Sequence, residues 1–491
     1  MGVVIKHASK NAIFTYLGFI VGAFYTAILV PKVFSEFPEY WGVARLLISY
    51  TVIFAPFAML GIPMAIIKYF PLFNKVERGK FIFGIVFWAF VGLSIISIII
   101  FVIARYWFID EQNILFNNNY FLLIPLIYGY VFMQIVDSIF QSLYKSNFYV
   151  FFKELGYRLI VLITILLYAF NIISFKVFLF SFSFAYIIVS IPLFIYLFNN
   201  KNITIKIDFS FLFTKRIKKI YIYAFFTMIS ASALIILNQI DSVMISKYLT
   251  LKDVAIYGPS LFIATTILVP SRSIMTVVRP MVADALSSNL IHKVKELYIK
   301  TSIVASTYAI FLFLIIWVNI DLVMNYYGAS FGKGKYIVLF ISLANIVNVL
   351  TGINGTIINI SKYYKVDIIF QVILILLTIG TNIILIPIYG INGAAFATFL
   401  TVVIHNLIKL IYVYVVMKIQ PFNSKSIMLV TLGTLLFILI TYRPLFGNLF
   451  ISSVIYSIFV TLFYWTIVYF LNFSKEINGL INKYLAKIII K

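Results

Sequence analysis

Long apolar segments separated by short polar stretches repeat along the whole chain of 491 residues. Most of these segments have about 20 residues or more, the length that an α-helix needs to cross the hydrocarbon core of a bilayer. We therefore predict an all-α polytopic membrane protein with fourteen transmembrane helices. They are residues 11–31, 42–67, 81–104, 119–144, 151–171, 177–198, 219–246, 255–283, 300–319, 336–361, 366–387, 391–416, 426–442 and 450–472.

Composition supports this class. Of all residues, 63% are hydrophobic and only 11% are charged, whereas about 25% are charged in ordinary soluble domains. The net charge of +23 could indicate nucleic-acid binding, but basic residues of membrane proteins collect in cytoplasmic loops, so no nucleic-acid partner is expected. Without Cys, and with three His far apart in sequence (His7, His292 and His405), the chain is expected to hold no metal and no cofactor.

The distribution of Lys and Arg predicts the orientation. With the N-terminus placed inside, the cytoplasmic segments hold 25 of these residues and the outer segments hold 8. Basic residues are enriched in cytoplasmic loops, so this alternation supports an even number of helices. We therefore expect a multi-pass protein of the cytoplasmic or inner membrane, with both termini in the cytoplasm.

The predicted organisation is two six-helix lobes followed by two helices. We assign residues 1–200 to the N-terminal lobe, 201–218 to a basic cytoplasmic loop, 219–418 to the C-terminal lobe, and 419–491 to two extra helices and a basic tail. The second helix of each lobe repeats a pattern, from Gly42 to Pro63 and from Gly258 to Pro280. A six-helix repeat preserves orientation, which favours parallel pseudo-repeats and alternating access around a central site. The two prolines could serve as paired bends.

Small residues gather at 385–398, "LIPIYGINGAAFAT", between two long apolar segments. Pro387 should end one helix, because proline disrupts the backbone hydrogen bonds, and Gly390 should allow a tight turn. Small residues in membrane helices permit close approach. We therefore predict a helical hairpin whose second arm packs tightly.

The motif "IPIYGINGAAFAT" (386–398), with the segment "ASKNAIFTYLGFIVG" (8–22), resembles the multidrug/oligosaccharidyl-lipid/polysaccharide (MOP) flippase superfamily. Within it, the chain is most similar to the polysaccharide transporters, which include O-antigen flippases. The resemblance covers the whole chain and implies a MATE-like 6 + 6 + 2 fold. It implies a transporter, not an enzyme, that moves lipid-linked oligosaccharide from the inner to the outer leaflet for cell-surface polysaccharide biosynthesis.

Charged residues inside predicted membrane helices are functional candidates, since each costs several kcal/mol to insert. They are Arg45, Asp137, Arg158, Asp241, Arg272, Arg279 and Lys409. Arg272 and Arg279 are about two helical turns apart and share a side with Thr276. Paired guanidinium donors suit a pyrophosphate. We therefore take Arg272, Arg279, Thr276 and Arg45 as candidate substrate-binding residues. The alternative for Arg272 and Arg279 is that their side chains extend to the membrane interface without binding substrate.

A second polar stripe carries Asn238 and Asp241, three residues apart. A carboxylate beside an amide oxygen suits Na⁺ or a proton, and the resemblance implies that some relatives bind a coupling cation on this helix. The alternative is a structural ion pair, for which Arg45 is the expected partner at the outer gate. Asp137 and Arg158 are expected to pair within one lobe, and Lys409 to snorkel to the interface.

Three functions remain open at this stage. A flippase for polyprenyl-pyrophosphate-linked sugars fits the excess of intramembrane cations, and a cation-coupled multidrug exporter of the same fold is the alternative. A membrane polysaccharide polymerase or glycosyltransferase would need outer acidic residues, for which Asp110 and Glu111 are the only adjacent pair. No phosphate-binding loop for ATP occurs. The expected partners are lipid-linked oligosaccharide, membrane lipids and other polysaccharide-assembly proteins, and the expected state is a monomer.

Overall fold

The computed structural model describes residues 2–103, 113–143, 149–198, 207–444, 446–479 and 482. Among these, side chains are described except for residues 2–12, 75, 103, 198, 229–231, 233–235, 237, 238 and 364. The chain forms two compact units, residues 1–258 and 259–491. The predicted lobe boundaries at residues 200, 219 and 418 stay a prediction.

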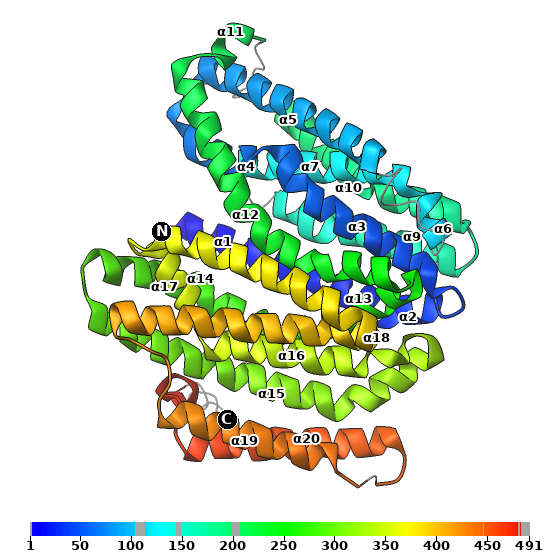
Figure 1. Cartoon of the computed structure of the whole chain (residues 1–491), viewed down its shortest axis with the longest axis vertical. Coiled ribbons are helices and arrows are strands. Elements are labelled where there is room, and N and C mark those ends of the chain that lie inside the picture. Colours follow the sequence, from blue (N-terminus) through cyan, green and yellow to red (C-terminus); the bar gives the residue numbers. More distant parts are fainter. Residues whose placement is uncertain are drawn as a thin grey trace. The chain divides into compact units, whose positions relative to one another are not determined.

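Unit 1 is built of helices only in its described part (Figure 1). They are α1 (Gly2–Ala23), a π-helical turn (Phe24–Leu29), α2 (Val30–Val33), α3 (Pro38–Met59), α4 (Ile62–Tyr69), α5 (Lys75–Ile103), α6 (Ile114–Asn117), α7 (Leu123–Ser142), a π-helical turn (Phe151–Gly156), α9 (Tyr157–Ala169), α10 (Phe175–Phe198), α11 (Phe209–Leu212), α12 (Lys215–Tyr248) and the first half of α13 (Leu251–Thr265). Short 3₁₀ turns at Phe70–Leu72 and Tyr120–Leu122 connect some of them. Helix α7 packs against α3, α4 and α10, and α12 packs against α3 and α4.

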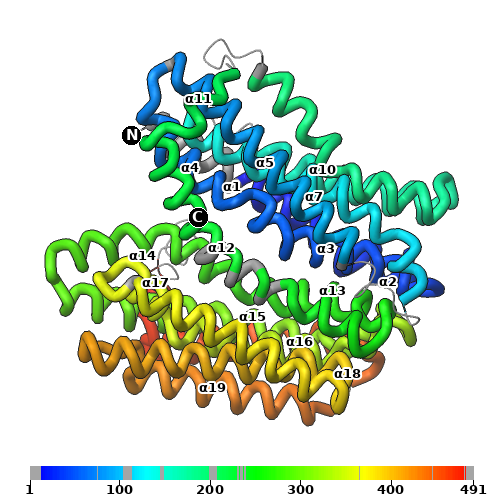
Figure 2. Tube along the Cα trace, turned by 45° about the horizontal axis from the view of Figure 1, so that its top comes forward, coloured from blue at the N-terminus to red at the C-terminus, as the bar shows by residue number. Residues whose placement is uncertain are grey.

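Unit 2 continues from α13 and is also helical throughout its described part. It contains α14 (Val269–Ser287), α15 (Ile291–Phe331), α16 (Lys335–Leu350), α17 (Asn354–Ile360), α18 (Tyr364–Met417), α19 (Ser424–Thr441) and α20 (Leu449–Phe470), with 3₁₀ turns at Thr266–Leu268 and Gly332–Gly334. Helix α18 packs against α16 and α17, as the trace in Figure 2 also indicates. Helices α19 and α20 both pack on α15.

Ten helices among the described residues are long and apolar enough to cross a membrane. Two of these stretches, Ile291–Leu350 and Lys365–Met417, have 60 and 53 residues, more than twice the length of about 20 that one crossing needs. The all-α membrane class is therefore confirmed. The count of fourteen stays a prediction.

Helix α18 is a hairpin that turns at Gly390, as the small-residue motif predicts. Gly390 has a non-helical backbone, with φ of 61° and ψ of −141°. The hydroxyl oxygens of Thr381 and Thr401, one on each arm, are 3.1 Å apart. Pro387 lies inside the first arm, so this helix continues beyond its predicted end at residue 387. The turn occurs at Gly390 as predicted, because glycine adopts positive φ without strain.

The two arms of the hairpin pack closely at Gly393. A Cβ atom added to Gly393 would lie 2.0 Å from the backbone oxygen of Leu385. Ala394, Ala395 and Ala397 are fully buried on the same arm. In lipid, helices associate by such close packing instead of by hydrophobic exclusion, so the predicted tight packing of the second arm is confirmed.

The two predicted proline bends fall at different places. The break between α3 and α4 lies at Gly61, which has a φ of 71°, and Pro63 follows in the first turn of α4. The break between α13 and α14 is the 3₁₀ turn Thr266–Leu268, and Pro270 follows it. Pro280 lies farther on, inside α14. The counterpart of Pro63 is therefore Pro270, since a proline in a first helical turn loses no hydrogen bond.

Polar contacts fix the last two helices to α15. Trp317 Nε1 donates to Thr441 Oγ1 of α19 at 2.9 Å, and Asn319 Nδ2 donates to Ser457 Oγ of α20 at 2.9 Å. The Tyr464 hydroxyl donates to a backbone oxygen of α15 at 2.7 Å. Interhelical hydrogen bonds of this kind contribute roughly 0.6–2 kcal/mol each in a membrane, so α15 is the support of this terminal pair.

Asp208 joins the described part of the basic loop to unit 1. Its carboxylate accepts hydrogen bonds from Ser210 Oγ at 2.6 Å and Phe211 N at 3.1 Å, and it pairs with Lys80 Nζ at 2.6 Å. The hydrogen bond from Lys80, followed by those from Ser210 and Phe211, lowers the pKa of Asp208 below its usual value.

The lowered pKa of Asp208 predicts that this loop detaches from Lys80 of unit 1 only in strong acid. A depressed folded-state pKa stabilises the folded state above the unfolded value of about 3.9, and this contribution is lost as pH falls through the lower folded-state value. The protection of the backbone amides of residues 207–214, which is the exchange rate relative to the intrinsic rate at each pH, should therefore be constant from pH 5 to 8. At neutral pH, Asp208→Asn should raise that exchange, whereas Asp253→Asn should leave it unchanged. Equal exchange in both variants would contradict the role of Asp208.

Candidate functional site

Arg45 on α3 is a partly buried cation inside unit 1. An added Cβ atom at Gly258 of α13 would lie 3.7 Å from Arg45 Cδ and 3.8 Å from Nε, so the side chain lies along that glycine. Arg45 Nε is buried and has no hydrogen-bond partner in the described part of the chain. The ion pairs between described residues do not include Arg45. Its electrostatic neighbours are the hydroxyls of Tyr25, Tyr157 and Tyr257.

Arg158 on α9 is the second cation of this region. Its Nη2 atom pairs at 3.3 Å with Glu154, one helical turn earlier, and its Nη1 atom is buried without a hydrogen-bond partner among the described residues. Helix α1 passes over it at Gly18 and Gly22, whose added Cβ atoms would lie 3.2 Å from Nη1 and 3.3 Å from Cδ. Tyr25 is within electrostatic reach of both Arg158 and Arg45. Unit 1 thus holds two guanidinium groups with unused donors around one tyrosine.

The predicted pair between Asp137 and Arg158 is wrong. Asp137 pairs with Lys153 Nζ at 3.3 Å and accepts a hydrogen bond from Gln141 Nε2 at 2.8 Å. Arg158 instead forms an ion pair with the carboxylate of Glu154. A partner four residues away along the chain needs no interhelical alignment, which accounts for the pairing of Arg158 with Glu154. Asp137 instead pairs across elements, from α7 to Lys153 in the π-helical turn.

Asp241 on α12 is buried, with an exposed fraction of 6%. Its carboxylate accepts a hydrogen bond from the Tyr257 hydroxyl at 2.7 Å. The ion pair predicted between Asp241 and Arg45 is not among those of the described residues. The hydroxyl of Tyr257 on α13 is therefore one partner of Asp241. The Asn238 side chain lies outside the described side chains.

The stripe on α14 lies away from the core of unit 2. Arg272, Thr276 and Arg279 are all exposed, and Thr276 Oγ1 donates to a backbone oxygen of its own helix at 2.7 Å. The opposite side of α14 packs into a buried cluster through Val278, Val282 and Ala285. The two arginines therefore share an outward side, as their spacing predicts, and their role in binding stays a prediction.

Comparison with solved structures identifies the fold of this chain. No protein-family model and no curated protein sequence matches the chain. The inward closed lipid II flippase MurJ is similar, with 17% sequence identity, coverage of 94% of this chain and 98% of that one, and a TM-score of 0.72. An inward-facing multidrug resistance MATE transporter of the MOP superfamily has 12% identity, coverage of 82% and 94%, and a TM-score of 0.62. The chain shares the fold of these two structures.

Another structure with the MOP transporter fold is informative about charge. A MOP superfamily transporter from Pyrococcus furiosus has 14% identity, coverage of 89% of this chain and 97% of that one, and a TM-score of 0.52. It is described as having a binding pocket of reversed polarity, which suggests a different function for it. The MOP transporter fold is thus compatible with pockets of different charge, so the charges of this chain's own residues must decide its substrate class.

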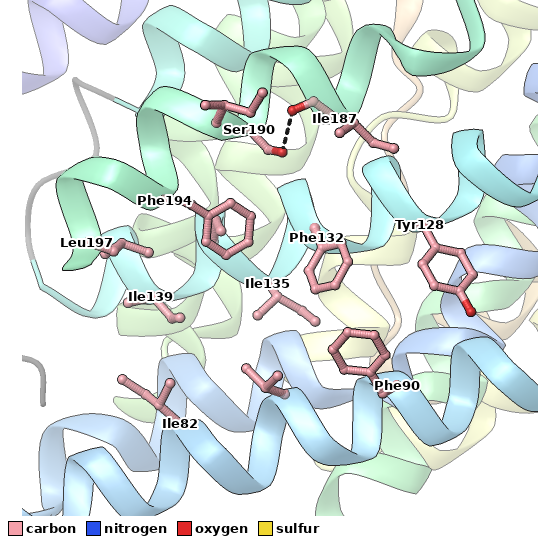
Figure 3. Close-up of a pocket in the computed structure, with 13 residues that line it drawn as sticks. Ile82, Phe90, Tyr128, Phe132, Ile135, Ile139, Ile187, Ser190, Phe194 and Leu197 are labelled. Carbon is pink, nitrogen blue, oxygen red and sulfur yellow. Dashed lines mark hydrogen bonds between the residues drawn. The ribbon is translucent and has the colours of Figure 1, made fainter. Parts of the chain in front are cut away.

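An apolar cavity of about 460 Å³ lies between α5, α7 and α10 of unit 1 (Figure 3). It is lined by Ile82, Val86, Phe90, Tyr128, Phe132, Ile135, Val136, Ile139, Ile187, Ser190, Ile191, Phe194 and Leu197. Ser190 Oγ donates to the backbone oxygen of Ile187 at 2.7 Å, so this hydroxyl needs no ligand. Because burying an unpaired charge in such surroundings is very costly, the cavity excludes a charged headgroup.

The same cavity suits a hydrocarbon chain. Phe90 and Ile191 at its rim are about half exposed, at 48% and 50%. Along α7 the cavity extends from Tyr128 to Ile139, roughly 16 Å at 1.5 Å per residue. One leaflet of a hydrocarbon core that is about 30 Å thick has nearly this depth.

Lys409 forms a buried ion pair within the α18 hairpin. Its Nζ atom is 3.1 Å from Asp367 Oδ1, and the two side chains are only 7% and 13% exposed. The expectation that Lys409 snorkels to the interface is wrong, because its side chain is buried and pairs with a carboxylate on the facing arm. Asp367 lies at the start of a predicted helix, and from the sequence alone a carboxylate at that position is expected to be solvent-exposed. The 42-residue separation of the two charges becomes visible only once the hairpin is recognised.

Proposed function

We propose that this chain is a flippase that moves polyprenyl-pyrophosphate-linked oligosaccharide from the inner to the outer leaflet, for cell-surface polysaccharide biosynthesis. Alternating access around a cationic central cavity carries the cargo. The observation that carries this proposal is Arg45, a partly buried residue whose Nε atom is buried and which has no ion-pair partner among the described residues. A buried charge is stable only when paired, and a pyrophosphate supplies the missing anion.

Arginine chemistry supports this substrate class. A guanidinium presents paired N–H donors that match phosphate oxygens. Arg45 and Arg158 both have unused buried donors near Tyr25, and Arg272 and Arg279 are exposed on α14. The apolar cavity between α5, α7 and α10 is compatible with the polyprenyl part of the same cargo. In this proposal the arginines bind the pyrophosphate headgroup, and the apolar cavity binds the hydrocarbon chain.

The energy source of the proposed transport is electrical or ionic. Each elementary charge gains about 2.3 kcal/mol per 100 mV of membrane potential, and an inside-negative potential drives an anionic pyrophosphate outward. We propose Asp241, together with Asn238, as the site of a coupling Na⁺ or proton or as the gate. The protein lies in the cytoplasmic membrane with both termini inside, acts as a monomer, and works with other polysaccharide-assembly proteins.

The proposal is tested by reconstitution in liposomes with a labelled lipid-linked sugar. Arg272→Gln with Arg279→Gln should lower the initial rate of translocation at least tenfold, because two phosphate-matching donors are lost. Lys295→Gln, an exposed cation of the same unit, should keep the wild-type rate. Wild-type liposomes that leave the lipid-linked sugar in one leaflet would overturn the proposal.

A cation-coupled multidrug exporter is the second candidate function. Two buried carboxylates, Asp137 and Asp241, favour it, since cationic drugs prefer an acidic site. The same liposomes discriminate the two functions: a drug exporter would expel a cationic dye and leave lipid-linked sugar untouched. A polymerase or glycosyltransferase is a weaker candidate, and its Asp110 and Glu111 lie outside the described residues.

A further inference from the structure

Residues 207–219 form an amphipathic edge of unit 1. Helix α11 packs on α5 (Figure 1), and its Leu212 is only 2% exposed because it fills the space beside Gly84 of α5. Three apolar residues of the same segment are 74%, 54% and 74% exposed; they are Ile207, Phe209 and Phe213. The segment is thus fixed to α5 on one side and presents an exposed apolar surface on the other.

The contacts of Phe209 show at which level of α5 this apolar surface lies. Its ring packs edge-on against the rings of Phe83 and Phe87 of α5, with centroids 5.1 and 5.7 Å apart. Both partners lie within Val76–Val102, a stretch that is long and apolar enough to cross a membrane. They follow Val76 by seven and eleven residues, roughly 10 and 17 Å of helix. Phe209 therefore lies beside the apolar span of α5, where its exposed surface meets lipid.

The first two turns of α12 add positive charge to the same edge. Three lysines are exposed there; they are Lys215, Lys218 and Lys219. None of the ion pairs between described residues includes them. The two carboxylates nearby already have other partners. Asp208 pairs with Lys80 at 2.6 Å, and Glu77 pairs with Arg216 at 3.6 Å. Three positive charges therefore lack a compensating carboxylate in the described part of this edge.

One side of α12 changes from cationic to apolar along the helix. Lys215, Lys219, Ile222 and Phe226 follow one another at intervals of three or four residues, so they share a helical side. Ile222 and Phe226 are 51% and 63% exposed. Cations followed by exposed apolar residues match the order of a lipid, whose charged headgroup precedes its acyl chains.

We propose that residues 207–219 bind an anionic phospholipid of the leaflet that they face. The three lysines bind its phosphate headgroup, and Phe209 and Phe213 contact its acyl chains. Charge complementarity selects this occupant, because uncompensated cations attract a lipid of net negative charge more strongly than a zwitterionic one. The exposed apolar surface adds burial that a soluble anion could not supply. In the orientation that the basic loops predict, this is the cytoplasmic leaflet.

The test measures hydrogen exchange of residues 207–219 in lipid nanodiscs without cargo. Discs of phosphatidylcholine are compared with discs of equal parts of phosphatidylcholine and phosphatidylglycerol. We expect the wild-type segment to exchange about tenfold more slowly in the anionic discs, since each Lys near an anionic surface strengthens binding. Lys215→Gln, Lys218→Gln and Lys219→Gln together should remove this difference. About 1 M salt, at which the Debye length is about 3 Å, should also remove it.

A second triple variant controls for net charge. Lys176→Gln, Lys252→Gln and Lys333→Gln remove the same charge from exposed lysines of predicted outer segments, and together they should keep the tenfold difference. Wild-type exchange that is equal in the two kinds of disc would overturn the proposal. A control variant that loses the difference would overturn it as well, because overall charge and not this edge would then attract the lipid.

The depth of the apolar surface is tested separately. The chain has no cysteine, so a nitroxide attached at Phe213→Cys labels this edge alone. In the anionic discs it should collide more often with oxygen, which concentrates in lipid, than with a water-soluble nickel chelate. The reverse order would place the apolar surface in water and contradict the proposed acyl-chain contacts. The surface goes beyond the proposed function, because it binds a resident lipid and failed translocation of cargo leaves both measurements intact.

Discussion

Replacing Arg45 by glutamine should lower the rate of lipid-linked sugar translocation by tenfold to a hundredfold. Hydrogen bonds to a charged group contribute about 1.5–3 kcal/mol, and each 1.4 kcal/mol changes an equilibrium tenfold. Arg45 has no ion-pair partner among the described residues, and its buried Nε donor is unused. The whole effect should therefore appear in cargo binding and transport, measured as the initial rate in liposomes at subsaturating cargo.

Two further variants separate the charge of Arg45 from its shape. Arg45→Lys keeps the charge but loses the planar pair of donors, so it should recover only part of the rate. Lys252→Gln removes an exposed cation of α13 and should have no effect.

The stability of Arg45→Gln gives an independent check. An unpaired charge destabilises a buried site, so the variant should unfold at the same denaturant concentration as the wild type or at a higher one. A large loss of stability would assign Arg45 a structural role instead.

The hydrophobic pattern predicts much of the fold. Because membrane spans require long apolar runs, segment edges agree closely where a helix is regular, as for the predicted segment 426–442 and α19 (Ser424–Thr441). The motif predicts the hairpin turn at Gly390, where positive φ favours glycine, but it predicts the end of the first helix too early, at Pro387, since proline is tolerated inside a membrane helix.

The candidate sites are less predictable because charge pairing depends on three-dimensional register. A count of charges in the middle of the predicted membrane helices omits Glu154, because it lies at the start of its predicted segment. Glu154 nevertheless forms an ion pair with Arg158. The count also omits hydroxyls, so nothing in the charge pattern indicates that Tyr257 binds Asp241. The small residues Gly18 and Gly22, four apart on α1, were an available sign of close approach to another helix, and they contact Arg158.

Sequence reasoning also missed the pair of Asp367 and Lys409. Both residues are visible as charges, but only a hairpin that turns at Gly390 brings them to 3.1 Å. Local patterns thus identify the helices and the turn, and the partner of each buried polar group follows only from the folded register.

Replacing Gly393 by alanine should strongly destabilise unit 2. The new Cβ atom would lie 2.0 Å from Leu385 O and 2.7 Å from Leu385 C, and backbone atoms cannot rotate away as a flexible side chain could. Overpacking of this kind costs about 1–3 kcal/mol or more, and relief requires the two arms of the hairpin to separate. The free energy of unfolding, measured by denaturant titration in lipid nanodiscs, should fall by at least that amount.

A matched control lies on the other arm of the same hairpin. Gly380 is helical, and an added Cβ atom there meets no atom within 4 Å. Because alanine is a better helix former than glycine by about 1 kcal/mol, Gly380→Ala should leave stability unchanged or raise it. Equal stabilities of the two variants would show that the arms are not in contact at Gly393, and the polar register that pairs Asp367 with Lys409 would lose its main steric support.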